Sequence, residues 1–202
     1  MNRDFASYDD FFYKNANDEL LEENVWIATI LNQLLAEKSG RIFDFGCGSG
    51  EWLKLFSSYS NDVYACDISP SAINYCKELH DRVNFFLFNG KSLPFLNESV
   101  DIIVCFWVIQ EILEEQQLEK ILGEFSRILN AHGLLLLIEN KYSDIRSIVR
   151  SDKFGDLMEM NGSIIRQFPN NSATDILGNY KLKCEKHTEK NSIFFEVYVK
   201  SL

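Results

Sequence analysis

The chain carries the stretch Phe43-Asp44-Phe45-Gly46-Cys47-Gly48-Ser49-Gly50 directly after a short apolar run, and Asp67 closes the next apolar run. Alternating glycines let the backbone leave a strand sharply and approach a ligand that side chains would hold away. The stretch therefore predicts a site for a nucleotide-like cofactor. A dinucleotide site would need the spacing G-x-G-x-x-G, but Glu51 stands where the third glycine belongs. The spacing thus disfavours NAD.

Outward from this turn, short apolar runs alternate with helical patterns. We expect an entry helix over 18–38, strands at 41–45, 62–66, 83–88, 100–106 and 133–139, and helices at 50–59, 70–80, 108–112 and 114–130. Such alternation is typical of parallel strands joined by crossover helices. The last two runs, 180–186 and 193–200, are too close together for a crossover and predict an antiparallel hairpin.

In the setting D-x-G-C-G-x-G, the turn at 44–50 resembles the first motif of the class I S-adenosylmethionine-dependent methyltransferases. The resemblance implies an α/β, Rossmann-like, doubly wound sheet. It would have seven mostly parallel strands, an antiparallel C-terminal strand and helices on both faces. We expect a single methyltransferase domain over 1–202, with an N-terminal helical cap at 1–40 and the core at 41–202.

The resemblance also implies where S-adenosylmethionine binds, with S-adenosylhomocysteine as the product. The glycine turn would wrap the methionine part. Asp67, 19 residues beyond Gly48, would hold the ribose hydroxyls, because a carboxylate can accept two hydrogen bonds at once. Asp67 could instead cap the next helix, but Ser69 is available for that role. The implied cofactor-binding residues are Asp44, Gly46, Cys47, Gly48, Gly50, Asp67, Ile68, Asn89, Gly90, Phe106 and Gln110.

Two of these positions depart from the family pattern. Asn89 replaces the usual aspartate before Leu93-Pro94-Phe95, and its amide oxygen could still accept a hydrogen bond from the adenine amino group. Taken locally, Asn89-Gly90 is also a plain turn dipeptide. Gln110 stands where many relatives have histidine and cannot take up a proton near neutral pH.

The acceptor side is less well marked. Candidate substrate-binding residues are Tyr13 in an aromatic N-terminal segment, Glu139 and Tyr142 at the end of the fifth strand, and Arg166, whose guanidinium could clamp a carboxylate or phosphate. A surface role for Arg166 is an equal alternative. No catalytic residue stands out, although Glu139, Glu111 and Tyr142 are conceivable bases.

Composition limits the partners. The 202 residues are 46% hydrophobic and include 20 Lys and Arg against 30 Asp and Glu, a net charge of −10, which disfavours nucleic acid and anionic membranes. The five cysteines are scattered without a metal-binding spacing, and no apolar run is long enough for a membrane span or signal peptide. We expect a cytoplasmic protein without a metal.

We therefore expect a methyltransferase acting on an oxygen, nitrogen or sulfur atom of a small molecule or of a glycan- or lipid-linked intermediate. Two alternatives stay open. One is a protein methyltransferase, and the other is a non-catalytic subunit that keeps the fold and cofactor binding but has lost turnover.

Overall fold

The computed structural model describes residues 24–38, 40–140, 148–160, 163–168, 173, 177–190 and 193–201. They fall into two compact units, one ending at Gly90 and the other beginning at Lys91. Tyr13 and Tyr142 lie outside the described residues. The single-domain organisation with a cap at 1–40 stays a prediction.

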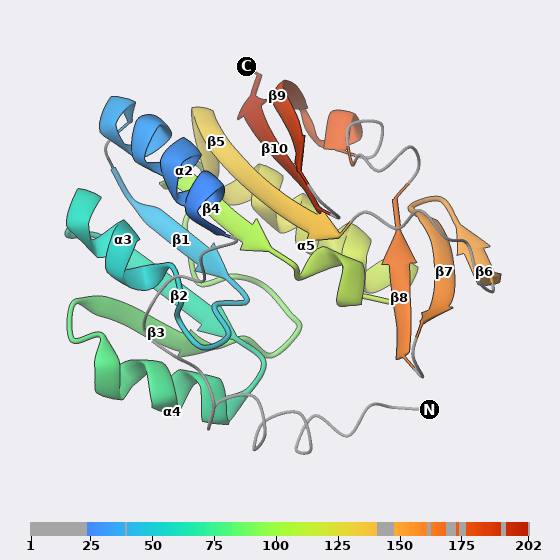
Figure 1. The fold of residues 1–202 in the computed structure, drawn as a ribbon, viewed down its shortest axis with the longest axis horizontal. Coiled ribbons are helices and arrows are strands. Elements are labelled where there is room, and N and C mark those ends of the chain that lie inside the picture. Colours follow the sequence, from blue (N-terminus) through green and yellow to red (C-terminus); the bar gives the residue numbers. More distant parts are fainter. Residues whose placement is uncertain are drawn as a thin grey trace. The chain divides into compact units, whose positions relative to one another are not determined.

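The first unit contains three parallel strands in the hydrogen-bonded order β3-β2-β1 (Figure 1). All four residues of β1 are buried, as are Val63, Ala65 and Cys66 of β2, which explains the apolar runs in the sequence. Its elements are α2 (Val25–Glu37), β1 (Ile42–Phe45), α3 (Leu53–Tyr59), β2 (Val63–Asp67), α4 (Pro70–Leu79) and β3 (Val83–Leu87).

Helix α4 begins as the sequence predicts. The Ser69 hydroxyl accepts a hydrogen bond from the Ala72 amide at 3.1 Å, and Pro70 occupies the first helical position, where its missing N–H costs no hydrogen bond. Ser69 is therefore the cap, which is confirmed, and Asp67 is not needed for that role.

The second unit orders its strands β4-β5-β10-β9, with α5 behind β4 and β5 in Figure 1. Strands β4 and β5 are parallel, whereas β10 runs antiparallel to both β5 and β9, so the predicted hairpin is confirmed. The bounds are β4 (Val100–Phe106), η2 (Ile109–Glu111), α5 (Glu115–Ile128), β5 (Leu129–Asn140), η4 (Gly178–Tyr180), β9 (Leu182–Lys190) and β10 (Ile193–Lys200).

The two units together supply the seven strands expected of the Rossmann-like class, and among the described strands of these two orders only β10 is reversed. The predicted α/β fold class is confirmed. Within the described residues, no helix is both long and apolar enough to cross a membrane.

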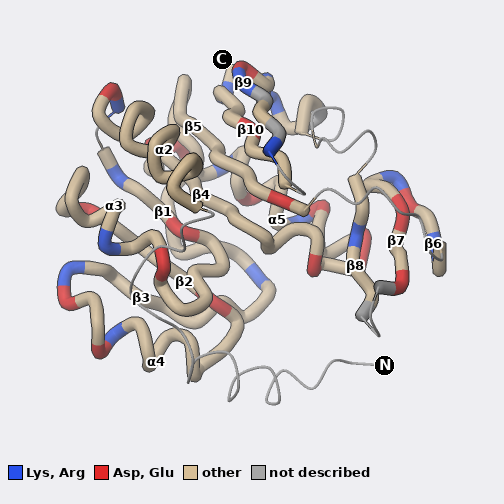
Figure 2. The backbone as a smooth tube through the Cα atoms, in the orientation of Figure 1, with Lys and Arg blue, Asp and Glu red and all other residues tan. Residues whose placement is uncertain are grey.

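The second unit also contains a small antiparallel sheet, β6-β7-β8, that the sequence analysis did not predict (Figure 1). Its strands are β6 (Ile148–Asp152), β7 (Gly155–Met160) and β8 (Ser163–Gln167). Charges of both signs are interspersed along them, whereas β4 is uncharged beyond its first residues (Figure 2). This mixed polarity hides the two-residue period by which strands are recognised.

Arg166 on β8 is 1% exposed and is bound by groups of its own unit. Its guanidinium donates to both carboxylate oxygens of Asp152, at 2.5 and 3.0 Å, and to the carbonyls of Ile112 and Leu113 at 3.1–3.3 Å. Each nitrogen of the guanidinium thus has an internal partner, and with the side chain this buried neither the acceptor clamp nor the surface role fits. Arg166 instead ties the small sheet to the chain that follows β4.

Replacing Arg166 should therefore cost stability. Arg166→Met removes the buried guanidinium from the Asp152 carboxylate, which keeps the Phe154 amide as a donor, and from the Ile112 carbonyl, and we expect the free energy of unfolding to fall by about 3–5 kcal/mol in urea denaturation. Arg150→Met is the matched control, because Arg150 is exposed and, within the described part of the chain, donates to the Leu113 carbonyl alone. It should cost less than about 1 kcal/mol. An equal loss in the two variants would contradict the structural role of Arg166.

Candidate functional site

The glycine turn leaves β1 in a backbone conformation that only glycine adopts without strain. Gly48 has φ +52° and Gly50 has φ +82°, and Gly46 likewise lies at positive φ. The amides of Gly46 and Cys47 both donate to the carbonyl of Cys66, at 2.8 and 2.9 Å, which fixes the start of the turn against β2. A Cβ atom on Gly48 would meet no protein atom within 4 Å, so the turn faces open space on that side.

Asp67 holds the turn from the end of β2. One carboxylate oxygen accepts a hydrogen bond from the Gly48 amide and the other from the Ser69 amide, each at 2.9 Å. Two amide donors are fewer than the roughly four hydrogen bonds that a carboxylate can accept. Asp67 is half-buried. The structure thus brings Asp67 and the glycine turn together, as the sequence spacing indicated.

Asp44, at the third position of β1, is 5% exposed. Burial, and secondarily the negative charge of Asp67, raise its pKa from 3.8 to about 8. Near neutral pH, the protonated form of Asp44 therefore predominates.

Cys47 is buried within the turn. A side-chain hydrogen bond with Cys76, followed by burial, raises the pKa of the Cys47 thiol. Cys76 itself donates to the Gly48 carbonyl at 3.3 Å. Because thiols react as thiolates, Cys47 is an unreactive packing residue that supports the turn.

The remaining cofactor candidates of the first unit follow β2 and β3. Ile68 is 48% exposed, Asn89 is exposed, and Gly90 has φ +77°. The Phe88 amide donates to the Asp67 carbonyl at 2.8 Å, which ties the chain leading to Asn89 to the end of β2. These residues lie at the carboxyl ends of parallel strands, the edge at which such sheets bind ligands.

In the second unit, the chain after β4 begins with a residue whose backbone conformation is strained, which the sequence did not predict. Trp107 has φ +57°, a conformation uncommon for an aromatic residue, and its amide donates to the Ile138 carbonyl at 2.6 Å. Phe106, just before it, is 7% exposed and packs edge-on against Trp107 and Phe195. No sequence signal marks such a conformation, because it results from contacts with β5.

Gln110 and Glu139 hold the same segment. The Gln110 side-chain oxygen accepts from the Asn140 amide at 3.0 Å, and one Glu139 carboxyl oxygen accepts from the Ile109 amide at 3.0 Å. Glu139 is fully buried, and burial raises its pKa well above the usual range. Its second oxygen has no hydrogen-bond partner among the described residues. The Glu139 carboxyl group, which we named as a substrate-binding candidate at the end of β5, is therefore an internal group, while Glu111 is exposed.

Comparison with known proteins finds a methyltransferase domain and methyltransferase relatives. A family model described as a methyltransferase domain matches residues 43–137. The ubiquinone/menaquinone biosynthesis C-methyltransferase UbiE of Campylobacter jejuni is 27% identical over 113 residues, covering 52% of this chain and 47% of that protein. The tRNA N(3)-cytidine methyltransferase METTL2 of Gallus gallus is 32% identical over 111 residues, covering 49% and 30%. The chain thus spans about half the length of UbiE and less than a third of the length of METTL2.

Solved structures share the fold over nearly the whole chain. The PH0226 protein of Pyrococcus horikoshii OT3 has a TM-score of 0.74 at 18% identity and covers 96% of this chain and 99% of its own. A Haloferax volcanii protein, solved in complex with the Trm112 methyltransferase activator, has a TM-score of 0.70 at 16% identity and covers 96% and 98%. With the glycine turn and Asp67 in place, these matches support a class I S-adenosylmethionine-dependent methyltransferase domain over residues 43–137, and the solved structures show that the chain shares their fold.

Proposed function

We propose that this chain transfers a methyl group from S-adenosylmethionine to a small molecule or to a glycan- or lipid-linked intermediate. The observation that carries the proposal is the bond from the Gly48 amide to the Asp67 carboxylate, which joins the glycine turn to the acid at the end of β2. Oxygen, nitrogen and sulfur are the acceptor atoms that we expected. We add carbon to these acceptor atoms, because the relative UbiE is by name a C-methyltransferase.

The residues of the first unit fit this cofactor. Gly46–Gly50 would hold the methionine part, since open space faces Gly48, and the Asp67 carboxylate beside the turn would accept the ribose hydroxyls. Asn89 and Ile68 would contact the adenine. When bound, the cofactor supplies an electrophilic methyl group on a sulfonium, so the protein has mainly to position the acceptor.

On the acceptor side, hydrogen bonds fix the backbone of the second unit, and they do not leave Glu139 free to act as a base. Glu139 is buried and binds the Ile109 amide, while Glu111 is exposed and could meet an acceptor. We therefore assign Glu139 to positioning the chain after β4 and keep Glu111 as the candidate base for acceptors that must lose a proton.

A tRNA acceptor is the competing proposal, because METTL2 is by name a tRNA methyltransferase. The net charge of −10 opposes binding to a polyanion, and the small-molecule class remains our proposal.

Calorimetry tests the cofactor directly. We expect S-adenosylmethionine to bind and NAD not to bind, because Glu51 takes the place of the third dinucleotide glycine. Absence of binding at millimolar S-adenosylmethionine would overturn the proposed function.

Gly48→Val should remove cofactor binding. Its side chain would enter the open space beside the turn, and φ +52° adds strain, so we expect affinity to fall at least about 100-fold, which corresponds to about 3 kcal/mol. Gly123→Val in α5 is the control, because a Cβ there also meets no atom within 4 Å. Thermal melts establish that each variant is folded. Unchanged affinity in a folded Gly48→Val protein would show that this turn is not the cofactor site.

Asp44→Asn should stabilise the cofactor-free protein in a pH-dependent way. The folded state keeps the Asp44 proton up to about pH 8, whereas the unfolded chain loses it near pH 3.8, so the aspartate increasingly favours unfolding as pH rises between these values. Asparagine does not titrate. The stability gain from the variant should therefore be small at pH 4 and reach the order of a few kcal/mol at pH 8.

Urea denaturation at the two pH values measures this gain. Asp81→Asn, which changes an exposed aspartate of the same unit, is the control and should show no comparable trend. If the gain for Asp44→Asn were the same at pH 4 and pH 8, Asp44 would not be a protonated buried acid.

A further inference from the structure

Asn24 stands at the start of α2 but does not cap it. Asparagine is among the preferred residues at this position, because its side-chain oxygen can accept a hydrogen bond from a free amide of the first turn. Here the Asn24 side chain forms no such bond with α2. Its amide group donates instead to the Glu51 carboxylate at 2.9 Å, across 27 positions of the sequence, and Asn24 is only 8% exposed. The side chain therefore serves a contact between elements and not its own helix.

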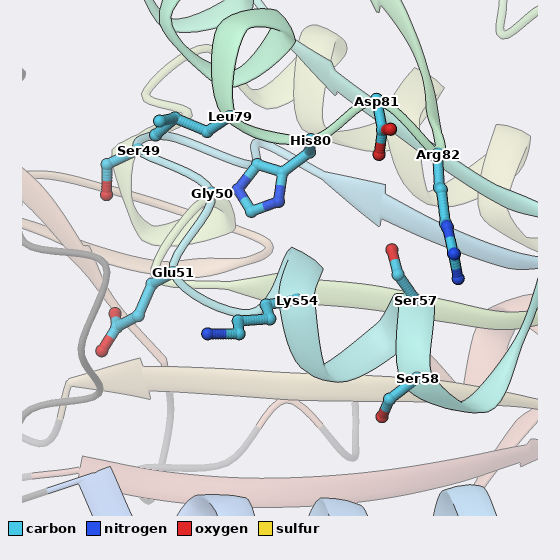
Figure 3. Close-up of a pocket in the computed structure, with 10 residues that line it drawn as sticks. All are labelled: Ser49, Gly50, Glu51, Lys54, Ser57, Ser58, Leu79, His80, Asp81 and Arg82. Carbon is cyan, nitrogen blue, oxygen red and sulfur yellow. The ribbon is translucent and has the colours of Figure 1, made fainter.

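Glu51 directly follows Gly50, the last residue of the glycine turn. In Figure 3 its carboxylate points away from His80 and Arg82, which line the pocket beside the turn from the end of α4. Lys54 is directed toward Glu51, but no ion pair joins the two in the part of the chain that the structure describes. Asn24 thus supplies the hydrogen bond that fixes this carboxylate.

The two halves of the glycine turn are held differently. Strand β2 binds the first half through the Cys66 carbonyl and the Asp67 carboxylate, which accept the amides of 46–48. In the second half, the Gly50 amide donates to a carbonyl of the turn itself at 2.8 Å. The contact at Glu51 therefore restrains, from another element, the half of the turn that lies beyond the bonds to β2.

We propose that Asn24 and Glu51 are a positioning pair for the cofactor, which holds the glycine turn in the shape that binds the methionine part. The assignment of the turn to the cofactor rests on the proposed function. The pair acts through the backbone of the turn and needs no contact with the cofactor. A turn that is already ordered loses less conformational freedom when a ligand binds, so the affinity is higher.

Amide hydrogen exchange of the cofactor-free, ¹⁵N-labelled protein tests the pair independently of the proposed function. Asn24→Ala and Glu51→Ala each remove the bond, and we expect the Gly50 amide to exchange at least about fivefold faster in either variant, because the turn opens more often. Glu51→Gln keeps an oxygen that can accept from Asn24 and should retain the wild-type rate. The Gly46 amide, which β2 binds, is the internal reference and should not change.

Tyr59→Phe is the matched control. The Tyr59 hydroxyl donates to the Asn32 side chain at 2.8 Å, so this variant also removes a side-chain bond to α2, but at the end of α3 that is farther from the turn. It should leave the Gly50 exchange rate unchanged. Thermal melts establish that each variant is folded. Wild-type exchange at Gly50 in folded Asn24→Ala, or equal acceleration in Tyr59→Phe, would refute the positioning role.

Calorimetry with S-adenosylmethionine separates this inference from the proposed function. If about a fifth of the molecules keep the competent turn, the apparent affinity falls about fivefold, and we expect this loss in Asn24→Ala and Glu51→Ala. Glu51→Gln and Tyr59→Phe should lose less than about twofold. An equal loss in Glu51→Gln would assign the Glu51 charge a direct contact with the cofactor and overturn the positioning role, as would full affinity in Asn24→Ala. Wild-type protein that does not bind would contradict the proposed function alone, and the exchange rates would still decide the role of the pair.

Discussion

The first unit depends on the hydrogen bonds that the Asp67 carboxylate accepts. This carboxylate accepts the Gly48 amide with one oxygen and the Ser69 amide with the other, so one side chain joins the glycine turn to the start of α4. The parallel register of β1 and β2 brings it there, with Phe45 opposite Cys66, the residue before Asp67. The Cys66 carbonyl then binds the next two amides after β1. The shape of the turn is therefore set by the neighbouring strand as well as by its own glycines.

The same carboxylate also explains the state of Asp44. Asp44 is buried, and Asp67 is half-exposed and bound to two amides, so the free energy is lower when the negative charge is on Asp67. The two acids thus have different roles despite their proximity. Asp67 carries the negative charge beside the turn, and Asp44 is a neutral group inside the strand.

Sequence reasoning succeeds in this unit because the signals are local. The glycine spacing, the acid that ends β2 and the Ser69–Pro70 helix start each depend on few neighbouring residues. It fails for Arg166 and Glu139, because their roles depend on distant partners. Arg166 pairs with Asp152 because β6, β7 and β8 fold into a sheet. The sequence does not tell whether Glu139 faces outward or inward, and the contact with the Ile109 amide in the chain after β4 decides it. No residue pattern gives the positive φ of Trp107.

These failures share a physical cause in the segment 107–113. The C-terminal end of β5 holds this segment through the Ile138 carbonyl, the Glu139 carboxyl and the Asn140 amide. Arg166 on β8 binds the last two carbonyls of the segment. The polar residues that we had taken for acceptor-binding groups therefore form hydrogen bonds with an irregular, partly buried backbone. Leaving the amides and carbonyls of such a backbone unpaired would cost free energy. A segment held from two sides is preorganised and changes little when a ligand arrives. Acceptor selectivity in this unit should then reside in the side chains that the segment presents outward, such as Glu111 and the half-buried Trp107 and Val108, rather than in the buried residues beneath them.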